Sequence, residues 1–166
     1  MQELIEREIN GFFVTGIKDF RKKIMAFEEQ LKKVPGALEG HENDETFLPL
    51  KHKFVDGAYV REIFMPKGTL LTSKIHKFRH PYFVMSGECS VLTEAGAKRI
   101  KAPYAGITEP GTKRIIYVHE DTVWITTHVT DETDLEKIED YIIAKTYDDP
   151  AVCLIEENTL KIGGSK

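Results

Sequence analysis

Residues 68–87 read GTLLTSKIHKFRHPYFVMSG, and this stretch gives the strongest indication of the fold. Side chains alternate between the two faces of a strand, so Lys74, His76 and His80 are expected on one face of an extended segment. Pro81 favours an extended conformation at the residue before it, which supports this continuity. The stretch therefore predicts a strand that carries one amine and two imidazoles toward one side of a sheet.

The spacing resembles the first motif of the cupin superfamily, a group of small jelly-roll β-barrels. That motif runs glycine, five residues, histidine, one residue, histidine, three or four residues, glutamate, six residues, glycine. Gly68, Lys74, His76, His80 and Gly87 occupy the corresponding positions, so a lysine replaces the first histidine and a histidine replaces the glutamate. The resemblance implies a mainly all-β, cupin-like jelly-roll barrel, and Gly87 is expected to form the tight turn into the next strand.

The second motif of the family is matched only in part. Pro110 and Gly111 are adjacent where the family separates them, and Arg114 stands where the family has a metal-binding histidine. His119 is the residue that we assign as the third donor beside the two histidines of the first motif, and His128 at the end of the following strand is the alternative. Histidines directed into an apolar cavity predict a site for one divalent transition metal, which could be Fe, Mn, Ni, Cu or Zn.

Several side chains near these positions are candidates for substrate binding. Lys74 and Arg114, at the two positions where the family has histidines, predict the capture of an anionic group such as a carboxylate or a phosphate. Glu62 is a candidate substrate-binding residue, fourth ligand or general base, although a cross-strand ion pair would explain it equally well. Tyr82 is a further candidate for substrate binding, and a place in the core is the alternative interpretation.

Two further segments resemble small cupin-like proteins of bacteriophages that have no assigned activity. They are YVREIF at Tyr59–Phe64 and HEDTVW at His119–Trp124. The resemblance covers roughly residues 50–140 and adds to the expectation of the fold rather than of a reaction. Proteins of this kind are frequently homodimers, so a homodimer is expected here.

Turn-forming residues recur about every ten positions after Leu50 and separate short runs rich in Val, Ile, Thr and aromatic residues. This pattern predicts a cupin-like β-barrel at residues 47–130, preceded by a helical segment and linker at 1–46 and followed by a helix and tail at 131–166. The expected strands are Tyr59–Phe64, Leu70–Ile75, Tyr82–Met85, Cys89–Thr93, Arg99–Lys101, Ile115–Val118 and Thr122–Val129.

Helices are expected on both sides of the barrel. Apolar residues recur at steps of three and four in Lys18–Val34, which predicts an amphipathic helix that packs on the barrel or on a second subunit. The polar stretch Ala37–Thr46 is expected to be a linker. Thr133 and Glu136 have the spacing of a capping box and predict the start of the C-terminal helix.

The composition narrows the classes of function. The chain has 166 residues, of which 41% are hydrophobic and 30% charged, with a formal net charge of −4, which predicts one folded domain and excludes extensive disorder. Lys and Arg do not cluster, so no nucleic-acid partner is expected, and no apolar run approaches the roughly 20 residues that cross a bilayer. The acidic N-terminus and the isolated Cys89 and Cys153 favour a cytoplasmic location, which would be the host cytoplasm for a phage protein.

Three functions remain open from the sequence. The first is a metal-dependent enzyme of dioxygenase, isomerase or lyase type that acts on a small anionic molecule in the barrel. The second is a metal-free cupin module that binds such a molecule without catalysis. The third is an accessory or structural phage protein that uses the barrel as a scaffold.

Overall fold

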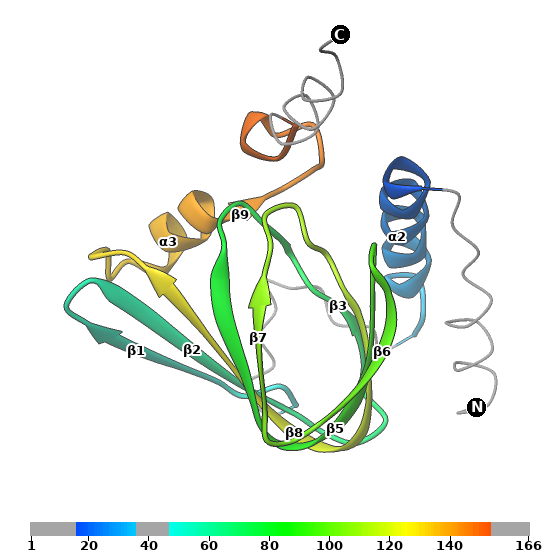
Figure 1. Ribbon diagram of the computed structural model, residues 1–166, viewed down its shortest axis with the longest axis horizontal. Coiled ribbons are helices and arrows are strands. Elements are labelled where there is room, and N and C mark those ends of the chain that lie inside the picture. The colour runs from blue at the N-terminus through cyan, green and yellow to red at the C-terminus, as the bar shows by residue number, and fades with distance from the viewer. Residues whose placement is uncertain (1–15, 36–46, 154–166) are drawn as a thin grey trace, which may run out of the picture.

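The computed structural model describes residues 16–35 and 47–153 and shows a rolled antiparallel sheet with helices against it (Figure 1). The fold is thus mainly β with flanking helices, as the sequence predicts. The strands are β1 Leu50–Val55, β2 Ala58–Met65, β3 Leu70–Thr72, β4 Ile75–His76, β5 His80–Thr93, β6 Gly96–Lys101, β7 Tyr104–Thr108, β8 Ile115–Val129 and β9 Ile143–Ala144. The helices are α2 Ile17–Leu31 and α3 Leu135–Ile142. The expected linker Ala37–Thr46 and the N-terminal helical residues before Gly16 lie outside the described residues.

Two long strands roll the sheet. The main sheet has seven strands in the order β1-β2-β8-β5-β6, while β3 pairs with β8 and β7 pairs with β5. β5 has 14 residues and β8 has 15, and each strand runs through positions where the sequence indicates turns. The separate strands expected at Tyr82–Met85 and Cys89–Thr93 are therefore both part of β5, and the turn expected at His119–Asp121 lies inside β8.

Gly87 bends β5 rather than ending it. The register between β5 and β8 shifts between Val84 and Ser86 and again between Ser86 and Glu88, so irregular pairing surrounds this glycine. Its φ of +82° is a left-handed conformation, and a Cβ atom here would lie 2.3 Å from the carbonyl oxygen of Asp121. The expectation that Gly87 reverses the chain is wrong, because the glycine instead permits the close approach of two backbones.

We expect Gly87→Ala to lower the free energy of unfolding by at least about 2 kcal/mol, since the new methyl group would combine a left-handed φ with a backbone clash. Gly57→Ala is the matched control, because Gly57 has a similar φ of +79° and a Cβ atom added there would meet nothing within 4 Å. Urea unfolding of both variants measures the difference. Equal losses of stability would show that the close approach at Gly87 contributes nothing.

The core fills the hollow of the sheet with alternate residues of its strands. Tyr59, Ile63 and Met65 of β2 share the inner face, and the even-numbered residues from Thr122 to His128 of β8 face them. The main cluster of buried apolar residues consists of Met65, Tyr82, Val84, Cys89, Val91, Ile100, Ile116, Val118 and Trp124. The end of the hollow near His128 is polar, and this is where the candidate site lies.

The two helices lie at different places on the barrel (Figure 1). Phe20 and Ile24 of α2 pack against Leu92 and Ile115, so the apolar stripe predicted in Lys18–Val34 covers the chain's own barrel. The helix α3 begins one residue after Asp134, whose side chain accepts hydrogen bonds from the backbone of Glu136 and Lys137. The capping residue is therefore Asp134 instead of the expected Thr133, because the helix starts later than the sequence pattern indicates.

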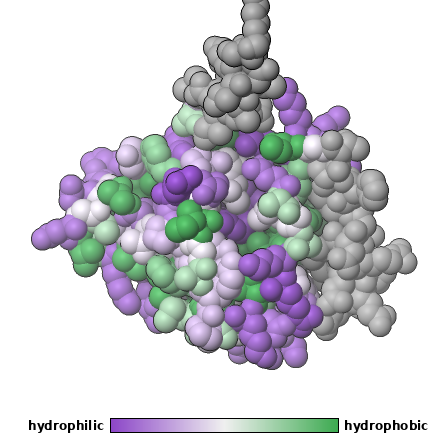
Figure 2. Space-filling view, viewed as in Figure 1, coloured by the Kyte–Doolittle hydropathy of each residue, from purple (hydrophilic) through white to green (hydrophobic). Residues whose placement is uncertain are grey.

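The surface is mixed in polarity. On the face drawn in Figure 2, apolar side chains lie in separate patches among polar ones. Within the described ranges, neither helix has the length and apolar character needed to span a membrane.

Candidate metal centre

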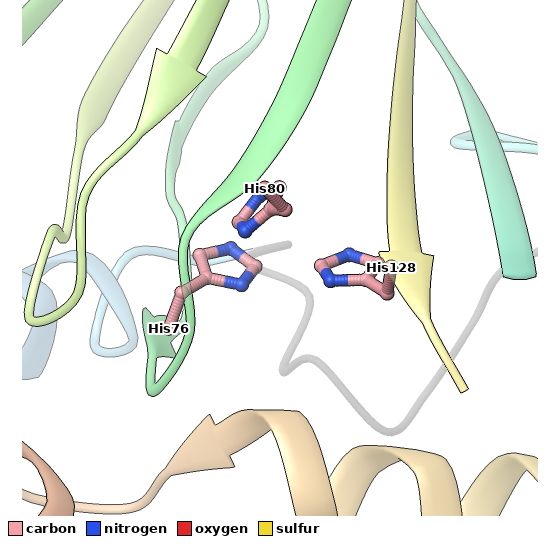
Figure 3. A group of neighbouring side chains, drawn as sticks. All are labelled: His76, His80 and His128. Carbon is pink, nitrogen blue, oxygen red and sulfur yellow. The ribbon is translucent and has the colours of Figure 1, made fainter.

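Three histidines converge at one end of the hollow (Figure 3). His76 comes from β4, His80 is the first residue of β5, and His128 lies near the end of β8. The ring centroids are 4.4 Å apart for His76 and His80, 4.2 Å for His80 and His128, and 5.6 Å for His76 and His128. One nitrogen from each ring lies within 4.8 Å of the others, so the three imidazoles, here called the histidine cluster, could coordinate one ion.

Strand pairing brings the cluster together. Tyr82 of β5 lies opposite Thr126 of β8, and two residues further along these antiparallel strands are His80 and His128. His76 is positioned by other contacts. It lies in β4, which pairs with β9, and the carbonyl oxygen of His76 accepts a hydrogen bond of 2.8 Å from the backbone amide of Gly111. The cluster thus depends on contacts between segments that are far apart in the sequence.

Hydrogen bonding leaves nitrogen lone pairs directed into the cluster. His80 is 3% exposed, and its Nδ1 lies 3.1 Å from the carbonyl oxygen of Phe78. A carbonyl can only accept, so Nδ1 carries the proton and Nε2 carries the lone pair. That Nε2 and the Nδ1 of His76 are both buried without a hydrogen-bond partner in the described part of the chain. Buried polar atoms without partners are uncommon in folded proteins, and here they lie where an ion would be bound.

Burial keeps all three rings neutral at neutral pH. It lowers the pKa of His128 to about 3, with help from the nearby His80 and Arg61. Burial also lowers the pKa of His80, and it holds the pKa of His76 well below the usual value. A neutral imidazole offers the lone pair that a metal requires, whereas a protonated one does not. The chemistry of this donor set therefore fits a transition metal that accepts nitrogen ligands.

His119, the third donor assigned from the sequence, lies elsewhere. Its Nε2 is 2.7 Å from the hydroxyl oxygen of Ser90, and its ring packs edge-on against Tyr117 with a centroid distance of 5.0 Å. His119 belongs to β8, as does His128, but the odd and even residues of that strand face opposite sides. The structure brings His76 and His80 together with His128 instead, which was the alternative left open by the sequence.

Lys74 and Glu62 also lie away from the cluster. The strand expected over Leu70–Ile75 is broken between β3 and β4, so the alternation that would align Lys74 with His76 is lost, and the Lys74 amine forms an ion pair with Glu139 of α3. Glu62 points outward and accepts a hydrogen bond of 2.7 Å from Lys51. The cross-strand ion pair was thus the better interpretation of Glu62, and the inward position on β2 belongs to its neighbour Arg61.

Arg114 and Tyr82 lie in the hollow, where Tyr82 belongs to the core, and their assignment to substrate binding stays a prediction. Arg114 is 6% exposed, its Nη2 donates a hydrogen bond of 2.8 Å to Thr108, and its guanidinium carbon lies 5.0 Å from the centre of the Tyr82 ring. Tyr82 stacks on Trp124 with a centroid distance of 4.6 Å, and burial raises the pKa of Tyr82 to about 12. Gly106 makes room for that ring, since a Cβ atom there would lie 2.6 Å from it.

Arg61, Thr126 and the placement of His128 were not predicted from the sequence. For β8 the signal was the alternation of Trp124, Thr126 and His128 along one strand, because a tryptophan is more often in a core than exposed. That alternation places the threonine and the histidine on the core face. For β2 no such signal exists, because Val60, Glu62 and Phe64 form as plausible an inner face as the true one.

The histidine cluster meets the surface at a small pocket. This pocket has a volume of about 190 Å³ and is lined by Phe78, Arg79, His128, Val129, Tyr141 and Ile142. Two of the lining rings contact each other: Phe78, just before β5, and Tyr141 of α3 have a centroid distance of 4.7 Å. This pocket, here called the mouth pocket, is where His128 of the cluster comes closest to the molecular surface.

Comparison with known proteins gives similarity in fold. No family model matches the sequence, and no curated protein matches it. A cupin family protein with a double-stranded β-helix fold from Methanocaldococcus jannaschii is 10% identical, covering 54% of this chain and 86% of its own, with a TM-score of 0.43. The cupin domain of Schizosaccharomyces pombe Cnp3 is 19% identical, covering 59% and 74%, with a TM-score of 0.44. A cupin-2 domain protein from Shewanella frigidimarina is 7% identical, covering 49% and 79%, with a TM-score of 0.41.

Proposed function

We propose that this chain is a cupin-like protein that binds one divalent transition metal ion through His76, His80 and His128 and a small anionic molecule beside it. The observation that carries the proposal is the convergence of three neutral imidazoles, two of which, His76 and His80, have a buried nitrogen without a hydrogen-bond partner in the described residues. His128 takes the place of the expected His119. Imidazole donors suit Fe, Ni, Cu and Zn, and the metal among these is a matter for measurement.

The residues around the cluster suit the binding of an anion. Arg114 is desolvated and rests on the faces of Tyr82 and Trp124, so it can bind a carboxylate or phosphate strongly. A bound metal would supply Lewis acidity toward a coordinated oxygen atom. The chain's own part is to hold the anion through Arg114 and to exclude water with the aromatic rings, which fits an enzyme of dioxygenase, isomerase or lyase type.

Elemental analysis of protein purified without chelator tests the metal centre. We expect about one transition metal ion per chain, and we expect His128→Ala to lower the affinity for that metal at least about 100-fold, since ligand loss should exceed the effect of losing an outer-shell partner. His119→Ala is the matched control, because it removes a histidine of the same strand that lies outside the cluster. Equal metal content in the two variants, or none in the wild type, would remove the proposal.

A metal-free binding module is the second candidate. It is supported by the two arginines of the hollow, Arg61 and Arg114, which can bind an anion without any metal. Anion-dependent stabilisation of a protein that binds no metal would favour this candidate. The homodimer, the cytoplasmic location and the likeness to phage proteins stay predictions from the sequence.

A further inference from the structure

A second ring of side chains lies directly behind the histidine cluster. Across neighbouring strands, Arg61 of β2 pairs with Thr126 of β8, Thr126 pairs with Tyr82 of β5, and Tyr82 pairs with Gly106 of β7. Directly opposed residues of antiparallel strands point to the same face, so these four positions share the inner face. We call them the inner layer. Arg114 adds a second guanidinium to this layer from above the Tyr82 ring.

The two guanidiniums flank the cluster from different sides. Arg114 reaches the hollow over the ring of Tyr82 on β5, whereas Arg61 enters it from β2, opposite Thr126. The backbones of Arg61 and Tyr82 are separated by two strand spacings, about 9–10 Å. The Arg114 guanidinium lies over the Tyr82 ring, so Arg61 and Arg114 approach the hollow across about this width of sheet.

Neither guanidinium has a carboxylate partner. Among residues 16–35 and 47–153, no carboxylate lies within ion-pair distance of Arg61 or Arg114. Glu139 of α3 is near enough to Arg61 to act on its charge, but its carboxylate is engaged by Lys74. The hydrogen-bond acceptors of Arg114 are neutral: its Nη2 donates to the hydroxyl of Thr108, and it also bonds to the side chain of Tyr82.

A hydroxyl group in the inner layer lacks a hydrogen-bond partner among the described residues. Thr126 is 8% exposed, and its hydroxyl oxygen is buried without a hydrogen-bond partner in the described part of the chain. By register, this hydroxyl lies between Arg61 and Tyr82. A buried hydroxyl without a partner costs stability, so its position points to a group that it would meet in the bound protein.

The charges in the hollow require an anion. Buried cations in proteins are paired or coordinated, because an unpaired one loses its hydration without compensation. The buried guanidinium of Arg114 and the partly buried one of Arg61 leave about two positive charges to balance beside three neutral imidazoles, and a planar carboxylate matches the fork of each guanidinium. One small monoanion would satisfy only one of the two.

We infer that Arg61 and Arg114 bind the two carboxylates of a short dicarboxylate, with the Thr126 hydroxyl as a further donor between them. This inference deepens the proposed function, since it names the class of anionic molecule at that site. Its charge argument does not depend on the metal.

Thermal unfolding of the metal-stripped protein in chelator tests the inference apart from the metal. Malonate, succinate, acetate and inorganic phosphate are compared as probes at equal ionic strength. We expect malonate or succinate to raise the melting temperature at concentrations at least about tenfold lower than acetate, since a second charge-assisted pair is worth that factor or more. Equal effects of acetate and the dicarboxylates would overturn the inference, as would a stronger effect of phosphate.

Three arginine variants test which arginines cause the rise in melting temperature with dicarboxylate. Arg61→Gln and Arg114→Gln should each weaken the dicarboxylate response at least about tenfold. Arg79→Gln is the matched control, because Arg79 is exposed at the rim of the mouth pocket and bonded to Glu109 at 2.8 Å. An unchanged response in Arg61→Gln would overturn the role of Arg61.

A last variant separates loss of binding from loss of folding. An unpaired buried cation destabilises the ligand-free protein, so Arg61→Met should melt at the same temperature as the wild type or higher when no anion is added, and should show no response to malonate. Arg61→Met protein that is less stable than wild type without anion would contradict the absence of an internal partner. These melting temperatures can be interpreted even if the protein binds no metal, because every sample contains chelator.

Discussion

Lys113→Met should lower the free energy of unfolding by about 3–5 kcal/mol, the cost typical of removing one partner of a buried ion pair. The Lys113 side chain is 4% exposed, and its amine donates hydrogen bonds of 2.6 Å to Glu28 and 2.8 Å to the carbonyl oxygen of Ser73. Burial raises the pKa of Glu28, but the hydrogen bonds from Lys113 and Thr72 outweigh it and hold that pKa below its usual value. Without the amine, a charged carboxylate would remain half-buried between α2 and the barrel.

Urea unfolding at neutral pH measures this loss. Lys51→Met is the matched control, since the Lys51 side chain is 67% exposed and its ion pair with Glu62 should contribute less than about 1 kcal/mol. The double variant Glu28→Leu with Lys113→Met should recover much of the stability, because no unpaired charge is left. A loss below about 1 kcal/mol in Lys113→Met would mean that the pair does not anchor the helix.

The metal-free protein should lose stability as the pH falls below about 6.5. An unfolded histidine binds its proton near pH 6.5, whereas burial lowers the pKa of His128 in the folded protein to about 3. Between these values the unfolded chain binds more protons, so each lower pH unit favours unfolding by about 1.4 kcal/mol for this group. The whole window is worth roughly 4–5 kcal/mol for His128 alone. His76 and His80 act in the same direction, since the pKa of each is also lowered.

Unfolding free energies measured in chelator at pH 7.5, 6.5, 5.5 and 5.0 check this expectation. Carboxylates titrate mainly below this range, so the slope reports histidines. His128→Gln should flatten the slope by up to one proton. A flat profile from pH 6.5 to 5.0, or the same slope in the variant, would show that the cluster is not held neutral by burial.

The sequence was sufficient for the fold class and for part of the site. The intervals around His76 and His80 placed both rings on the inner side of a rolled sheet, and the Pro-Gly turn placed Arg114 there as well. The inward face of His80 follows from strand alternation, which a sequence records directly. His76 lies in β4 and Arg114 precedes β8, so their places beside His80 depend on tertiary pairing, which a sequence does not record.

The residues that were misplaced depend on strand continuity and register. Lys74 leaves the expected face because the strand breaks before β4, and nothing in SKIH marks that break. His128 joins the cluster because β8 pairs with β5 in one register, and a shift by one residue would have turned its ring outward. Arg61 rather than Glu62 points inward for a related reason. Strand alternation shows that neighbouring side chains lie on opposite faces of the sheet, but it does not show which of the two is inside.

The pairing of β4 with β9 sets the order in which the centre is completed during synthesis. His80 and His128 belong to the β5–β8 ladder, which needs the chain only as far as residue 129. His76 is held by Ile143, and the next backbone amide, that of Lys77, donates to the carbonyl of Ile142. A nascent chain stalled on the ribosome between those two points would contain the rolled sheet with two imidazoles in place. The pairing that helps to hold His76 would therefore form only when the segment after α3 has emerged.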